Sequence, residues 1–70
     1  MYVNGTVKFH VGDSVVFVNN IKVLDIETNI KYPIFSGRIL VIIEMLDNDT
    51  YILHHKYKMT KNDIVKNCVH

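Results

Sequence analysis

Short runs of hydrophobic residues, separated by turn signals, indicate that this chain is built from β-strands. The clearest run covers residues 11–18, where a Gly-Asp pair precedes an unbroken Val-Val-Phe-Val segment and two asparagines follow it. Successive side chains of a strand point to opposite faces, so Val15 and Phe17 should share one face and Val16 and Val18 the other. Both faces of this strand are therefore apolar at its centre.

Two further strands are predicted at residues 35–46 and 50–55, joined by the acidic turn at residues 47–49. Both faces of the longer strand are apolar, because Ile39 and Val41 alternate with Leu40 and Ile42. A glycine near its start indicates a bulge or a sharp bend. Residues 1–8 alternate more loosely and predict a frayed first strand or a small hairpin.

The connection at residues 19–34 is too long for a tight turn and too apolar for a disordered linker. We expect a long ordered loop with its tip at residues 27–29, closing around Tyr32 and Pro33. Further on, Thr60 followed by Asp63 has the spacing of a helix N-terminal cap. Because few residues remain, it predicts a single 3₁₀ turn, followed by a final strand at residues 65–69.

The 70 residues are enough for one domain, spanning residues 1–70 with a core at about 9–69. The hydrophobic content of 49% is typical of a globular chain, and the net charge of +1 gives no broad field for attracting polyanions. The first residues do not resemble a signal peptide, and the aliphatic run at residues 39–43 is too short to cross a bilayer.

With a single cysteine, the sequence predicts a cytoplasmic protein without an internal disulfide. A composition rich in Ile, Lys and Asn without Ala or Trp suggests an AT-rich source, such as a phage, a virus or a low-GC bacterium.

The order of these segments resembles the SH3-like small β-barrels, including their KOW-type and Tudor-like branches. Residues 11–16 are similar to the segment that opens such a barrel, residues 36–40 and 50–53 to its next paired strands, and residues 61–64 to the turn before its last strand. The resemblance implies an all-β, five-stranded SH3-like barrel with a long loop between the first two core strands. Two features depart from the pattern, since the long loop replaces the compact basic turn of KOW motifs and no Trp is present for a proline-motif groove.

The two-faced apolar strands are the main functional signal, because the outer face of a small barrel is polar unless a loop, a second subunit or a partner covers it. The sequence therefore predicts a non-catalytic protein-binding module that self-associates. The AT-rich character of its composition suggests a phage or viral protein that binds a host factor. The predicted interface consists of Val16, Val18, Leu40, Ile42, Tyr32 and Phe35. Alternation alone does not decide whether these strand residues or their opposite-face neighbours point outward.

Two other functions remain as alternatives. A nucleic-acid-binding barrel would use local basic charge with an interleaved aromatic ring, and the residues available are Arg38, Lys56, Tyr57, Lys58 and Lys61. Lysines on an exposed edge strand also prevent aggregation, which is the simpler interpretation. A homo-oligomer could instead hold a small anionic ligand such as a nucleotide, with Arg38 and the histidines as contacts, although no phosphate-binding glycine loop is present.

Metal binding and catalysis have weaker signals. Cys68 and His70 would share a strand face, and His54 or His55 could approach from a neighbouring strand, as in a zinc site. The spaced cysteine pairs of structural zinc sites are absent, so no metal and no other cofactor is predicted. Cys68 beside a histidine could act as a nucleophile, but a small barrel fills its interior with its own side chains, and we expect no enzyme and no catalytic residue.

Overall fold

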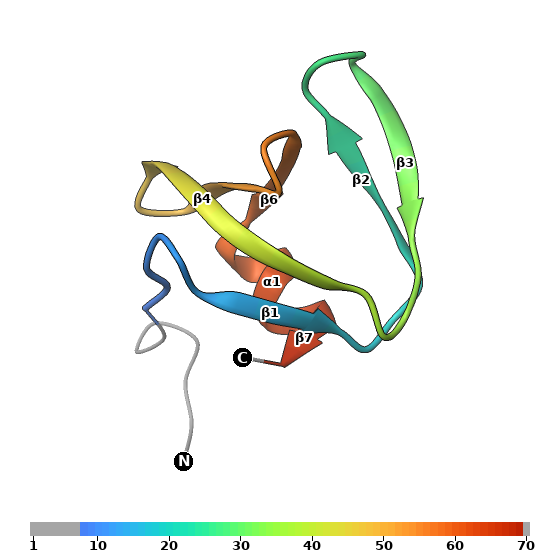
Figure 1. Cartoon of the computed structure of the whole chain (residues 1–70), viewed down its shortest axis with the longest axis horizontal. Helices are drawn as coiled ribbons and strands as arrows, with labels where there is room; N and C mark the ends of the chain where they lie inside the picture. The colour runs from blue at the N-terminus through green and yellow to red at the C-terminus, as the bar shows by residue number, and fades with distance from the viewer. Residues whose placement is uncertain (1–7, 70) are drawn as a thin grey trace.

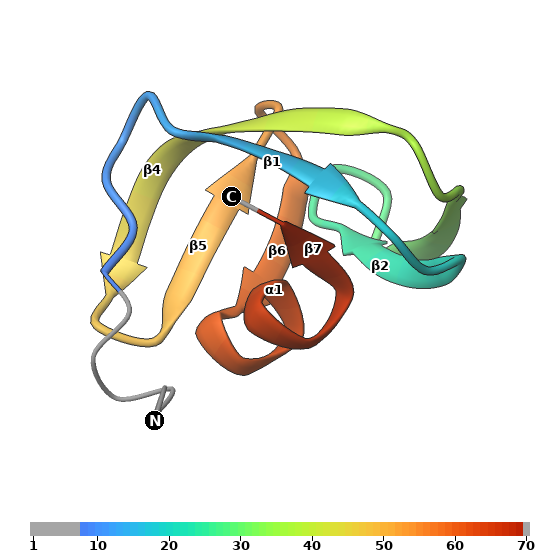
Figure 2. The ribbon, with the colours of Figure 1, turned by 90° about the horizontal axis from the view of Figure 1, so that it is seen from below.

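The computed structural model describes residues 8–69, which fold into seven strands and one short helix (Figure 1). The elements are β1 (Ser14–Phe17), β2 (Ile21–Asp25), β3 (Ile30–Ile34), β4 (Ile39–Asp47), β5 (Thr50–Leu53), β6 (Tyr57–Thr60), α1 (Lys61–Asn67) and β7 (Cys68–Val69). The strands form one sheet in the order β3-β2-β6-β5-β4-β1-β7, in which every neighbouring pair is antiparallel. This sheet curls into a half-barrel (Figure 2), a fold compatible with an SH3-like barrel.

The all-β prediction is confirmed, but the predicted count of five strands is wrong. Three of the seven strands lie where no strand was predicted, with β2 and β3 inside residues 19–34 and β6 in the connection after residue 56. The strand or hairpin predicted for residues 1–8 falls almost entirely outside the described residues. Within the described part of the chain, no helix is long and apolar enough to cross a membrane.

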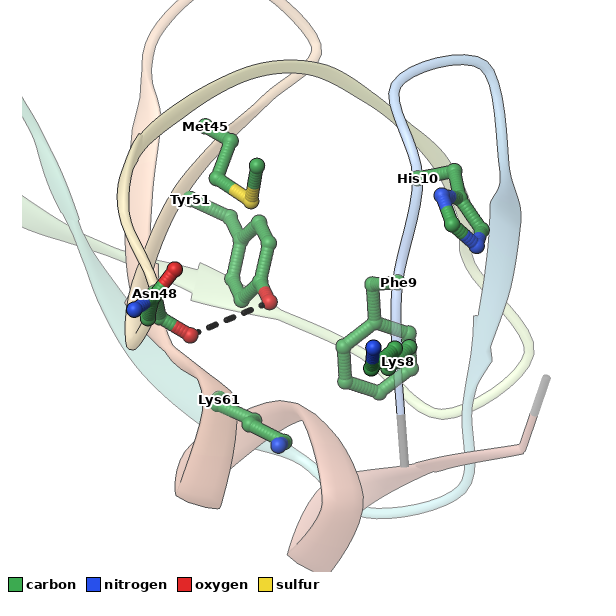
Figure 3. A pocket seen from close by; sticks show the side chains of 7 residues that line it. All are labelled: Lys8, Phe9, His10, Met45, Asn48, Tyr51 and Lys61. Atoms are coloured by element: carbon green, nitrogen blue, oxygen red, sulfur yellow. Dashed lines mark hydrogen bonds between the residues drawn. The ribbon is translucent and has the colours of Figure 1, made fainter. Parts of the chain in front are cut away.

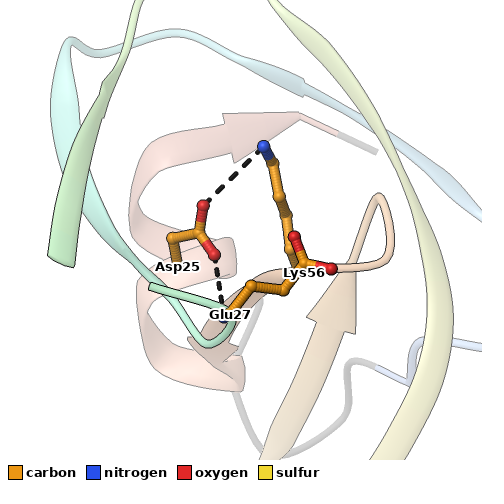
Figure 4. Close-up of polar contacts among 3 residues, drawn as sticks. All are labelled: Asp25, Glu27 and Lys56. Atoms are coloured by element: carbon orange, nitrogen blue, oxygen red, sulfur yellow. Dashed lines mark hydrogen bonds and ion pairs between the residues drawn. The ribbon is translucent and has the colours of Figure 1, made fainter. Parts of the chain in front are cut away.

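Residues 19–34 form a hairpin rather than an irregular loop, and the predicted tip lies in its turn. Asp25 organises this turn, because its carboxylate accepts a hydrogen bond from the Glu27 N–H at 2.9 Å and its carbonyl accepts one from Asn29 at 2.8 Å. The Asp25 carboxylate also lies 3.7 Å from the Lys56 ammonium, in the turn between β5 and β6 (Figure 4). The hairpin is thus fastened to the rest of the sheet by a buried polar group.

The long strand β4 carries the alternation that the sequence indicated, and its inner face holds Leu40 and Ile42, both 0% exposed. Their placement on an outer interface was therefore wrong, since they belong to the core between the curled strands. A register shift between Ile42 and Glu44 then reverses the alternation. As a result the Glu44 side chain stays exposed and Met45 lies opposite the buried Tyr51.

The predicted 3₁₀ turn is a seven-residue α-helix, α1. Its cap was predicted correctly, because the Thr60 hydroxyl accepts a hydrogen bond from the Asp63 N–H at 3.2 Å. Ile64 is 0% exposed and joins the hydrophobic core from this helix. The helix continues to residue 67, so the final strand, predicted at residues 65–69, is reduced to β7.

Candidate functional site

The outer surface of β4, β1 and β7 carries a continuous row of aliphatic side chains. In the register of the sheet, Val16 of β1 lies opposite Ile39 of β4 on one side and opposite Val69 of β7 on the other. Directly opposed residues of neighbouring strands point to the same face, so these three side chains lie side by side. Figure 2 shows the three strands adjacent to one another, with β1 in the middle.

The row extends to two further valines at alternate positions of the same strands, Val18 after β1 and Val41 in β4. We call the five residues Val16, Val18, Ile39, Val41 and Val69 the outer apolar face. Ile39 is 58% exposed and Val69 is 54% exposed, while Val16 in the middle is half-buried. None of the five is charged. The face therefore presents to water the kind of contiguous apolar surface that marks an interaction site.

Of the six predicted interface residues, Val16 and Val18 lie on the outer apolar face. The sequence left open whether the predicted strand residues or their opposite-face neighbours point outward. In β4 it is the neighbours, because Ile39 and Val41 point outward in place of Leu40. Val69 was not predicted, since only its pairing with β1 brings it beside Val16.

The remaining two predicted residues, Tyr32 and Phe35, come from the neighbouring hairpin and its exit. Tyr32 is 40% exposed on β3, the outermost strand at the other edge of the sheet. Phe35 is 64% exposed in the turn before β4, where the Gly37 N–H donates a hydrogen bond to the Phe17 carbonyl. Phe35 thus belongs to a turn held at the end of β1, whereas Tyr32 belongs to a different part of the sheet. A role of these residues in binding stays a prediction.

The residues predicted for nucleic-acid binding do not gather on one surface. Tyr57 is only 7% exposed, so its ring cannot act as a stacking platform for bases. The Lys56 ammonium is paired with Asp25 and lies 5.3 Å from the centre of the Tyr57 ring. Lys58 and Lys61 line two different concavities, and Arg38 is exposed in the turn before β4.

One of these concavities lies beside Tyr51 and has a volume of about 390 Å³ (Figure 3). It is lined by Lys8, Phe9, His10, Met45, Asn48, Tyr51 and Lys61. The Tyr51 hydroxyl donates a hydrogen bond to the Asn48 carbonyl at 3.4 Å, and the ring of Phe9 meets that of Tyr51 edge-on at 5.6 Å.

Burial, followed by the nearby carboxylates of Asp49 and Asp47, raises the pKa of Tyr51 in the cavity wall. The structure does not assemble the predicted contacts of a small anionic ligand here. His10 lines this cavity, whereas His54 and His55 lie in the turn between β5 and β6.

Cys68 is buried in the core, where it behaves as a small hydrophobic residue. Burial raises the pKa of its thiol to about 11, which keeps it protonated and unreactive at neutral pH. His54 and His55 are exposed in their turn, and His70 lies outside the described residues. Among residues 8–69, no three His, Cys, Asp or Glu side chains lie close enough together to hold a metal ion.

The chain matches no protein-family model, and the comparisons with curated proteins and with solved structures give no match either.

Proposed function

We propose that this chain is a non-catalytic protein-binding module of SH3-like architecture that self-associates through its outer apolar face. The observation that carries the proposal is the row of Ile39, Val16 and Val69, which crosses three neighbouring strands and reaches the edge of the sheet. More than half of the Ile39 and Val69 surface is open to water. In a chain with a thin core, such side chains would be expected inside unless another surface covers them.

A second copy of the chain is the occupant that fits this face best. A two-fold symmetric interface brings the same patch together from both subunits, so the patch has to be complementary to itself. An uncharged aliphatic face meets this condition, because no like charges approach one another across the axis. Two curled sheets can pack face to face at about 10 Å, with the aliphatic side chains of both copies between them.

The expected association is weak. Full burial of an aliphatic side chain contributes about 1.5–3 kcal/mol, and these side chains are already partly covered, so each gains about 1 kcal/mol. The ten side chains of two copies would together contribute roughly 10 kcal/mol, which is similar to the 4–15 kcal/mol that association costs in lost freedom of motion. At the lower end of this cost, about 4–6 kcal/mol, the remaining free energy corresponds to a dimer with a dissociation constant between about 40 μM and 1 mM.

Sedimentation velocity over a range of concentrations tests this proposal. The wild-type chain should shift from monomer to dimer with rising concentration, and Ile39→Lys should weaken association at least tenfold by placing two like charges in the interface. Ile30→Lys is the matched control, because Ile30 is 55% exposed on β3, outside the outer apolar face. Circular dichroism of each variant checks that it is folded.

A wild-type chain that stays monomeric at millimolar concentration would refute self-association, as would equal effects of Ile39→Lys and Ile30→Lys. In the first case the outer apolar face would remain available to a different protein, such as a host factor of a phage or virus. Capture experiments with wild type and Ile39→Lys would then be compared, and only a partner that the variant loses would support the wider proposal of a protein-binding module.

A further inference from the structure

A second concavity lies between β2, β6 and α1 and has a volume of about 380 Å³. It is lined by Ile21, Lys22, Val23, Leu24, Lys31, Lys58, Asp63, Lys66 and Asn67, and we call it the basic groove. The register of the sheet explains its origin, because β2 pairs with β6 only through Leu24 and Asp25. The first half of β2 therefore diverges from β6, and α1, which follows β6 directly, lines the opening.

Four lysines surround this groove. Lys31 and Lys58 lie opposite Leu24 on its two sides, so their Cα atoms are about 10 Å apart, which is two strand spacings. Lys22 is two residues before Leu24 in β2 and shares its face, and Lys66 comes from the last turn of α1. All four side chains are exposed.

The charge of these lysines is not neutralised by the protein. In the described part of the chain, the one ion pair within 4.0 Å joins Lys56 to Asp25, and neither residue lines the groove. The acidic side chain present in the groove lining is Asp63, which leaves a local charge of +3. The other four basic and six acidic side chains of the chain sum to −2. The net charge of +1 is therefore unevenly distributed, with positive charge concentrated at the groove.

We propose that the basic groove binds the phosphate backbone of a nucleic acid. Lysine ammoniums are point charges that suit phosphate oxygens without demanding one geometry. The lysines come from four elements around the groove, and no glycine lies in its lining to form a phosphate-binding loop for one small anion. A polymer with a charge at every unit can contact several of these lysines at once.

The groove supplies charge but little else that could read a sequence. Its lining contains no aromatic ring for base stacking and no arginine for bidentate contacts to guanine. Binding should therefore be independent of sequence and governed by release of counterions. An acidic peptide is the competing polyanion. It is less favoured because the aliphatic lining residues, Ile21, Val23 and Leu24, all come from one strand, β2, and most of the lining is polar or charged, so the groove offers a peptide side chain little apolar contact.

Fluorescence anisotropy of a labelled 20-nucleotide single strand of mixed sequence tests the proposal, with a duplex of that sequence and a labelled oligoglutamate in parallel. If four phosphates are engaged, log K should fall with log salt concentration with a slope of about −2.8 for the single strand or about −3.6 for the duplex. Lys31→Gln/Lys58→Gln should weaken binding at least fivefold at 50 mM salt and reduce the slope for the single strand by about 1.4.

The matched control is Lys8→Gln/Lys61→Gln, which removes the same charge from the cavity beside Tyr51. It should change affinity less than twofold. The proposal is overturned if neither oligonucleotide shows salt-dependent binding, if both double variants lose affinity equally, or if oligoglutamate binds as tightly as the oligonucleotides. Preferred binding of either the single strand or the duplex, with loss confined to Lys31→Gln/Lys58→Gln, supports it and identifies which form the groove accepts.

Discussion

Replacing Asp25 by alanine tests how the β2–β3 hairpin is held to the sheet. Asp25 is 2% exposed and is the charged side chain buried in the described part of the chain. Its carboxylate caps the hairpin turn through the Glu27 N–H and pairs with the Lys56 ammonium (Figure 4). Asp25→Ala removes both contacts and leaves the part-buried Glu27 N–H without its acceptor.

The expected decrease in the free energy of unfolding can be estimated from these two contacts. A hydrogen bond to a charged group contributes about 1.5–3 kcal/mol. The pair with Lys56, whose side chain is 37% exposed, adds about 0.5 kcal/mol once solvent screening is considered. Asp25→Ala should therefore lower the free energy of unfolding by about 2–3 kcal/mol, out of a total of about 4–10 kcal/mol for a chain of this length. The melting temperature should fall by roughly 10–20 °C.

Urea unfolding followed by circular dichroism and tyrosine fluorescence provides the measurement, because the chain has four Tyr and no Trp. It should be carried out at a concentration low enough to keep the chain monomeric. Glu27→Ala is the control, since this exposed side chain lies in the same turn and its backbone N–H contact with Asp25 survives. The reasoning fails if Asp25→Ala costs less than about 0.5 kcal/mol or if Glu27→Ala costs as much.

Three further changes have calculable outcomes in the same unfolding assay. Gly37→Ala should cost about 1–2 kcal/mol, because the φ angle of Gly37 is +94° while the added methyl group meets no atom within 4 Å. Thr60→Ala should cost about 1 kcal/mol by removing the acceptor of the Asp63 N–H. For Cys68, the pKa is raised to about 11 from the 9.0 of a free thiol, so the unfolded chain loses this proton first. Stability should decline between pH 9 and 11, and Cys68→Ala should lessen that decline. Equal stability of wild type and variant in the first two cases, or equal pH dependence in the third, would contradict these assignments.

The features that the sequence predicted correctly are those decided by neighbouring residues. Strands β1, β4 and β5 follow from alternation, the turn between β4 and β5 from its acidic residues, and the helix cap from the spacing of Thr60 and Asp63. Each of these signals acts within a few residues along the chain. Local physics was therefore sufficient for them.

The errors arose where the outcome depends on position within the sheet. Residues 19–34 were predicted as a loop that closes around Pro33, yet Pro33 lies in β3, an edge strand paired with β2, which is a position where a sheet tolerates proline. The inward direction of Leu40 likewise follows from the pairing of β4 with both neighbours, not from its alternation. The basic groove contains Lys22 and Lys66, which are far apart in the sequence and are brought together only by the fold. No local run of charged residues could therefore predict it.

The two proposed surfaces lie on separate parts of the sheet, so a negative result for one proposal can be distinguished from a negative result for the other. The outer apolar face belongs to β4, β1 and β7, the basic groove to β2, β3, β6 and α1, and β5 lies between the two groups of strands. A charge placed at Ile39 should therefore leave phosphate contacts intact, and loss of charge at Lys31 should leave self-association intact. If either change abolished both properties, loss of the common fold would be the explanation, because only the core connects the two surfaces.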